Sequence, residues 1–179
     1  MPHISIGNDL PGISGLLADR PDSAAPLNQL VNVLLRGPSP LPRGERELIA
    51  AYVSELNRTR FCSDSHGAFA AAQLDGGEEL VTAVLNDLET APVSEQLRAL
   101  LRVAAEVQAF ARPVSEKAVA AARAEGAGDD EIHDTVLIAA AFCMYNRYVS
   151  CLDTELPADR SYYTEGAERI VAHGYGSPR

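Results

Sequence analysis

Two side chains capable of redox and acid–base chemistry, Cys62 and His66, stand four residues apart. On an α-helix this spacing places both side chains on one face. We expect Cys62 to open a helix, where its thiol would sense the positive end of the helix dipole while the neighbouring imidazole takes its proton. Both effects favour the thiolate over the thiol, so the spacing predicts an activated cysteine nucleophile.

A carboxylate that could support this pair precedes it. Glu47 lies fifteen residues before Cys62, in a segment with apolar residues at helical spacing. In a relay, Glu47 would orient or deprotonate His66 and so keep a base beside the thiol. Each residue also has a structural interpretation: a small buried apolar side chain for Cys62, a hydrogen-bonded structural histidine for His66, and a charged, solvated first helical turn for Glu47.

The other two cysteines, Cys143 and Cys151, fall in an apolar stretch and are interpreted as packing residues. Their separation corresponds to ~12 Å along a helix at 1.5 Å per residue, which is too far for them to bridge each other. One of them could still approach Cys62 from a neighbouring helix or subunit. Arg147 in the same stretch needs a partner, and Glu47 or another carboxylate is expected to provide it.

Composition limits the classes of function. The 179 residues have the length and apolar content of a single soluble domain, 1–179, in which residues 1–10 form an N-terminal tail. A net charge of −10 argues against a nucleic-acid or anionic-membrane partner. No membrane span or secretory signal is evident, which favours a cytoplasmic protein. The three cysteines do not form a disulfide framework, and the four scattered histidines lack zinc-ligand spacing, so we expect neither metal nor cofactor.

Apolar periodicity predicts an all-α, multi-helix bundle without strands. The helices 117–125 and 132–151 are expected to form a helical hairpin. Two helices are expected within residues 10–36, divided at Arg20-Pro21, and the second is expected to start after Asp22 or Ser23. The other expected helices are one that starts at Arg43, one that starts at Cys62, one over 78–86, one capped by Ser94, one over 117–125 capped by Ser115, one over 132–151 and one over 161–173.

Three stretches carry a resemblance to a known family: Leu35–Leu41, Glu47–His66 and Phe142–Arg147. Together they resemble the alkylhydroperoxidase D-like branch of the carboxymuconolactone decarboxylase family, and its peroxidase-related members most of all. The likeness extends in order over residues 11–175. The resemblance implies the all-α fold of that family and homo-oligomers, with a dimer, trimer or hexamer as the expected assembly.

The family pattern is a glutamate, a Cys-x-x-Cys and a histidine four residues after the second cysteine. On this pattern Glu47 matches the glutamate, Cys62 the second, peroxidatic cysteine and His66 the relay histidine, while Thr59 replaces the first cysteine. The resemblance therefore implies a cysteine-dependent peroxidase that reduces hydrogen peroxide or small organic hydroperoxides. Because threonine cannot form a disulfide, either an external thiol or dithiol reductant resolves the oxidised Cys62, or another cysteine substitutes for the missing one, or the peroxidase activity has been lost.

Two alternatives stay open at this stage. One is the parent family's lactone decarboxylation, which would not use thiol redox chemistry. The other is a non-enzymatic redox sensor or helical oligomer that has kept a degenerate site after loss of the first cysteine.

Overall fold

Helices account for every regular element in the computed structural model, which describes residues 2–176. In chain order they are α1 (Gly12–Asp19), α2 (Pro21–Arg36), α3 (Arg43–Leu56), α4 (Arg60–Ala71), α5 (Gly77–Asn86), α6 (Glu95–Ala109), α7 (Glu116–Ala124), α8 (Asp129–Cys151) and α9 (Ser161–His173). The predicted all-α fold is confirmed.

Local signals set most of the helix ends. The Ser94 hydroxyl accepts a hydrogen bond from the backbone N–H of Leu97, and Ser115 caps α7 in the same way. The predicted start of α2 was wrong, because the helix begins at Pro21 and not after Asp22 or Ser23. Proline fits the first helical position, where its missing N–H would have had no intrahelical partner.

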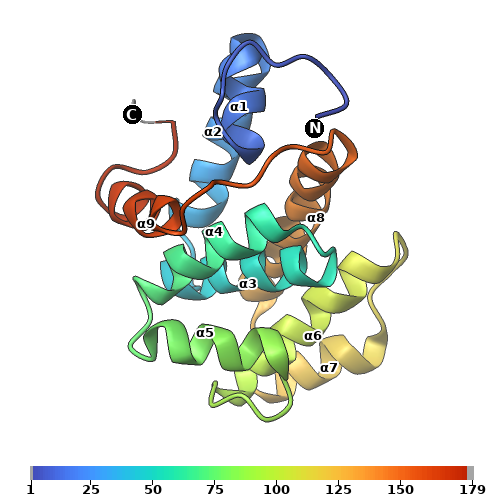
Figure 1. Ribbon diagram of the computed structural model, residues 1–179. Coiled ribbons are helices and arrows are strands. Elements are labelled where there is room, and N and C mark those ends of the chain that lie inside the picture. Colours follow the sequence, from blue (N-terminus) through green and yellow to red (C-terminus); the bar gives the residue numbers. More distant parts are fainter. Residues whose placement is uncertain (1, 177–179) are drawn as a thin grey trace.

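The hairpin at the centre of the bundle is formed by α3 and α4 (Figure 1). A short turn joins them, in which Arg58 adopts a left-handed conformation with φ of 56°. The pair expected from the sequence, α7 with α8, does not pack in this way: α7 lies against α6, while α8 packs on α6 and α3. Apolar patterning identified the helices but not their partners, because several apolar faces compete for the same neighbours.

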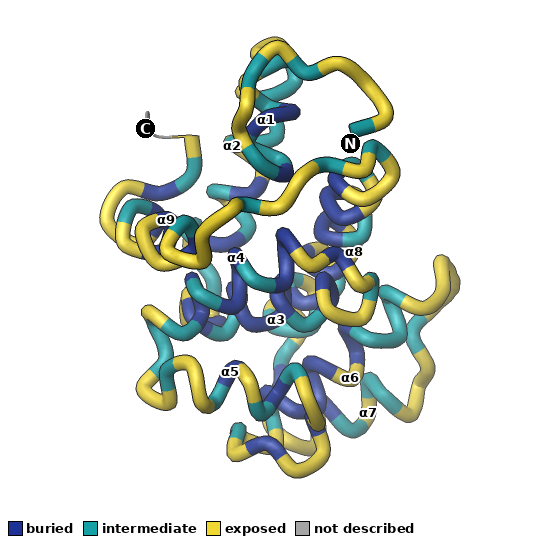
Figure 2. The backbone as a smooth tube through the Cα atoms, in the orientation of Figure 1, coloured by how far each residue is buried: buried dark blue, intermediate teal, exposed yellow. Residues whose placement is uncertain are grey.

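Most of α3 is buried, as the dark trace through the middle of Figure 2 shows. The main core gathers apolar side chains of α2, α3, α6 and α8, including Leu35, Ile49, Leu100 and Ile138, all of which are fully buried. A smaller cluster lies at the start of α4 and contains Phe61, Cys62, Val149 and Tyr163. The α3–α4 hairpin therefore lies between two groups of side chains. Helices α9 and α1 lie on the side where α4 begins, and the main core lies on the other side.

Within residues 2–176, no helix combines the length and apolar character that a bilayer crossing requires.

Candidate active site

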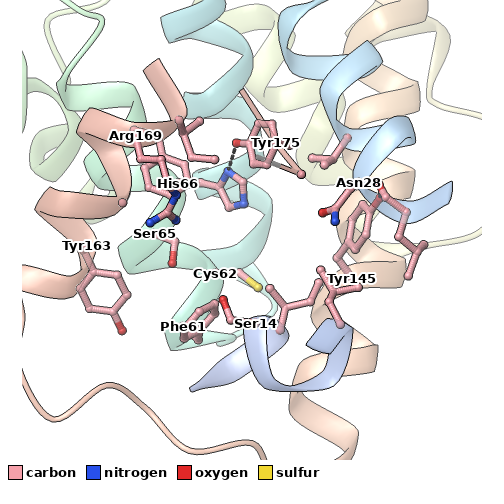
Figure 3. Close-up of a pocket in the computed structure, with 18 of the residues that line it drawn as sticks. Ser14, Asn28, Phe61, Cys62, Ser65, His66, Tyr145, Tyr163, Arg169 and Tyr175 are labelled. Carbon is pink, nitrogen blue, oxygen red and sulfur yellow. Dashed lines mark hydrogen bonds between the residues drawn. The ribbon is translucent and has the colours of Figure 1, made fainter. Parts of the chain in front are cut away.

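The α3–α4 hairpin brings Glu47 and His66 together. His66 Nδ1 lies 2.7 Å from Glu47 Oε2, and Glu47 is almost fully buried. An ionised carboxylate can only accept hydrogen bonds, so Nδ1 is the donor and a neutral imidazole keeps its lone pair on Nε2. Figure 3 shows this second ring nitrogen facing an open cavity.

A third member, Tyr175, completes this group from the segment that follows α9. Its hydroxyl donates to Glu47 Oε1 over 2.7 Å and lies 3.4 Å from His66 Nδ1. Burial and the adjacent charge of Glu47 raise the pKa of Tyr175 well above its ordinary value, so the hydroxyl keeps its proton and remains a donor. Sequence reasoning missed Tyr175; the only local signal is its position between Gly174 and Gly176, both with positive φ.

Aromatic rings fix the orientation of His66. Phe142 and Phe69 pack edge-on against the imidazole, with ring centroids 4.5 and 5.3 Å from its own. Together with the bond to Glu47, these contacts leave His66 one orientation, with one edge on the carboxylate and the other toward the cavity.

Cys62 lies one turn before His66 on α4, and its side chain points into the same cavity (Figure 3). The helix begins at Arg60, so Cys62 is its third residue and does not open it as expected. The thiol is buried, and burial raises the pKa of Cys62 from 9.0 to about 12, although a hydrogen bond from Asn146 acts in the opposite direction. The expected activated thiolate is therefore not the resting state; at neutral pH the sulfur carries its proton.

Three amide side chains lie behind Cys62, of which Asn146 is buried and Asn57 and Gln108 are half-buried, and no sequence pattern pointed to them. Gln108 donates to Asn57 Oδ1, Asn57 donates to Asn146 Oδ1, and Asn146 donates to the Ser54 hydroxyl, each over 2.9 Å. This row of hydrogen bonds joins α6, the α3–α4 turn and α8. It holds Asn146 in one orientation, with its amide beside the sulfur.

The cavity has a volume of about 240 Å³. It opens between α1, α2, α4, α8 and α9, and its walls are mainly apolar and aromatic. Its lining residues include Leu27, Val31, Phe61, Phe69, Phe142, Tyr145 and Ile170 beside Cys62 and His66.

Thr59 stands where the family pattern has its first cysteine. Its hydroxyl lies 2.9 Å from the hydroxyl of Ser150, so it joins the hairpin turn to α8. Of the cysteines in the described chain, only Cys62 lines the cavity: Cys143 is half-buried beside Asn57, and Cys151 is exposed.

The suggested pairing of Arg147 with Glu47 was wrong. Arg147 is exposed, and its guanidinium donates to the carbonyl of Cys143 one turn earlier on α8. The partners of Glu47 are His66 and Tyr175 instead.

Comparison with known proteins agrees with this geometry. The model of the carboxymuconolactone decarboxylase family matches residues 21–106, the stretch that carries Glu47, Cys62 and His66. Residues 21–106 are therefore similar to that family. The resemblance seen in the sequence is thereby confirmed.

Two solved structures share the fold. One is described as an uncharacterized peroxidase-related protein from Silicibacter sp. TM1040; it is 27% identical, with a TM-score of 0.76 over 86% of this chain and 78% of its own. The other is described as an alkylhydroperoxidase AhpD core, an uncharacterized peroxidase-related protein from Ralstonia eutropha JMP134. It is 24% identical, with a TM-score of 0.77 over 88% of this chain and 82% of its own, and shows the fold alone. No curated protein gave a significant match.

Proposed function

We propose that this protein is a cysteine-dependent peroxidase in which Cys62 attacks a hydroperoxide and the Glu47–His66 pair moves the proton. The observation that carries the proposal is that a buried thiol and a carboxylate-backed imidazole line one cavity, one helical turn apart. The family match and the peroxidase-related neighbour from Silicibacter sp. TM1040 support it.

The first step uses the resting thiol. His66 Nε2 takes the proton from Cys62, and the carboxylate of Glu47 stabilises the resulting imidazolium. The thiolate then attacks the terminal oxygen of the hydroperoxide, the O–O bond breaks, and the departing alkoxide takes the proton back from His66. The products are Cys62 sulfenic acid and an alcohol, or water when the substrate is hydrogen peroxide.

The second half of the cycle needs an external reductant, because Thr59 offers no thiol. One external thiol condenses with the sulfenic acid, releasing water and forming a mixed disulfide. A second thiol, or the other arm of a dithiol, attacks that disulfide and returns Cys62 to the thiol. Two thiols are thus oxidised to one disulfide for each hydroperoxide reduced.

The raised pKa of Cys62 is the observation that favours a second candidate, a redox sensor whose cysteine oxidises slowly. The two differ in whether His66 accelerates the reaction. In a peroxidase, His66 generates the thiolate of Cys62 during the reaction, so removal of His66 would slow the oxidation. In a slow sensor, removal of His66 would leave the oxidation rate unchanged.

The test starts from a Cys143→Ser/Cys151→Ser background, in which Cys62 is the remaining thiol. After addition of a hydroperoxide, trapping with dimedone and mass spectrometry should find one adduct on Cys62, and dithiothreitol should support turnover. His66→Gln and Glu47→Gln should slow adduct formation, His66→Gln by about 100-fold, the size of a typical general-base contribution. Cys62→Ser in the same background is the matched control.

Absence of an adduct with every hydroperoxide would exclude the peroxidase. An adduct that forms equally fast without His66 would favour the sensor.

A further inference from the structure

The cavity is much larger than hydrogen peroxide requires. Its volume is about 240 Å³, whereas hydrogen peroxide has only two heavy atoms. An apolar cavity of ~150 Å³ already holds a benzene ring. The space beside Cys62 therefore fits a hydroperoxide carried on an aromatic or branched hydrocarbon body.

One charged side chain lines this space. Among the described residues that form the cavity wall, Arg169 alone carries a permanent charge; the others are apolar, aromatic or neutral polar, apart from the titratable Cys62 and His66. The buried Glu47 is screened from the cavity behind His66 and Tyr175. A guanidinium is always protonated and presents its donors in a fork that matches a carboxylate.

The guanidinium of Arg169 has no counter-ion among the residues that the structure describes. Across residues 2–176 its guanidinium forms no ion pair and no hydrogen bond, although the chain has ten more acidic than basic residues. Figure 3 shows Arg169 reaching from α9 toward the wall of the cavity that carries Ser65, whose hydroxyl is a further donor. A half-buried cation at an apolar wall is stabilised when an anion binds to it.

We propose that the substrate is an organic hydroperoxide that bears a carboxylate. Its apolar body fills the cavity, its carboxylate binds Arg169 with help from Ser65, and its hydroperoxide group is held at Cys62. This inference rests on the proposed function for the reaction, but the binding site can be tested without it.

Binding is measured first, by calorimetry on Cys62→Ser protein, with two unreactive probes of one shape: 4-isopropylbenzoate and 4-isopropylbenzyl alcohol. The carboxylate should bind about tenfold or more tightly than the alcohol. Arg169→Gln should abolish this difference, while Arg169→Lys should retain part of it. Arg160→Gln is the matched control, since Arg160 is an exposed arginine at the start of the same helix and outside this cavity.

The reaction is measured second, as the rate of Cys62 oxidation in the Cys143→Ser/Cys151→Ser background by cumene hydroperoxide and by its para-carboxylate. The carboxylate should react about tenfold faster, and the preference should disappear in Arg169→Gln but persist in Arg160→Gln. If Arg169→Gln and the parent prefer the carboxylate over the neutral compound equally, both in binding and in rate, the substrate assignment is overturned. The proposal that the protein is a peroxidase would then still stand. Selective binding without oxidation by either compound would overturn the peroxidase and retain the carboxylate site.

Discussion

At the scale of single residues, two effects on the thiol of Cys62 compete, and their sizes decide the outcome. A position in the first turn of α4 favours the thiolate by at most about 2 kcal/mol. Burial raises the pKa from 9.0 to about 12, which corresponds to roughly 4 kcal/mol in favour of the protonated form. Desolvation therefore dominates, and the site depends on His66 to remove the proton during the reaction.

The raised pKa of Cys62 predicts that the rate at which this thiol reacts with an alkylating reagent depends steeply on pH, provided that the reagent attacks the thiolate without help from the protein. In the Cys143→Ser/Cys151→Ser background, alkylation of Cys62 by iodoacetamide should speed up about tenfold for each pH unit between pH 8 and 11, because the thiolate fraction grows in that proportion below the pKa. Mass spectrometry of quenched samples gives the rate. A plateau below pH 9 would contradict this prediction.

Tyr175 is a positioning residue, acting through Glu47 on His66. Tyr175→Phe keeps the ring that stacks on His66 but removes the donor to a buried carboxylate, which should cost about 1 kcal/mol of stability. We expect Cys62 oxidation to slow about tenfold and its pH profile to shift. Denaturant melts and the pH dependence of the dimedone rate measure the two effects.

The matched control for Tyr175→Phe is Tyr148→Phe, a half-buried tyrosine of α8 outside the cavity. It should leave the pH profile unchanged. A Tyr175→Phe protein with lower stability but the wild-type pH profile would show that Tyr175 has a structural role only.

At the scale of elements, the end of α9 determines where Tyr175 lies. Gly174 ends the helix with φ of 79° and ψ of −175°, a conformation that side chains with a Cβ rarely adopt. An added Cβ would also lie 2.7 Å from Asn32 Oδ1, whose oxygen accepts the backbone N–H of Tyr175. Gly174 thus allows the chain to turn back onto α2 and α3.

Gly174→Ala should therefore displace Tyr175 and reproduce the slow oxidation of Tyr175→Phe, with a stability loss of about 1–3 kcal/mol. Gly77→Ala is the matched control: Gly77 also has a positive φ, of 54°, but a Cβ there meets no atom within 4 Å. It should lose about 1 kcal/mol and oxidise at the parental rate. Parental oxidation in Gly174→Ala would show that the turn does not control the site.

At the scale of the whole molecule, burial of Cys62 links stability to pH. The pKa of Cys62 is higher in the folded protein, about 12, than its ordinary value of 9.0. The unfolded chain therefore loses its proton first, so this contribution to stability is complete below pH 9 and is lost as the pH rises toward 12.

Between pH 9 and 10, the free energy of unfolding should fall by about 1 kcal/mol more in the parent than in Cys62→Ser, because serine does not titrate there. Urea melts of both proteins at the two pH values measure the difference. Equal slopes would show that the sulfur is not desolvated. The expected homo-oligomer stays a prediction, which sedimentation of the intact chain would test.

Most of what could be predicted from the sequence was local. Ser94 and Ser115 marked helix starts because a cap is made by side chains within three residues, and the apolar spacing of α3 located that helix nearly to the residue. The helix expected at 161–173, with a stop at Gly174, has the bounds of α9. The family resemblance added the association of Glu47 with His66, which spacing alone left open.

Contacts between distant segments could not be read in the same way. The partner of α8, the contact of Tyr175 with Glu47 across 128 residues, and the amide chain behind Cys62 depend on which helix faces meet. Apolar periodicity shows that a face will be buried, but not against which neighbour.

The sequence by itself determined that this chain is a helical protein with a thiol, an imidazole and a carboxylate at the spacing of a peroxidase-like site. Only the tertiary structure decided the protonation of that thiol, because α8 and α9 pack over the start of α4 and exclude water from Cys62. Helix spacing is encoded in neighbouring residues, whereas desolvation is a property of everything that surrounds an atom in the folded chain.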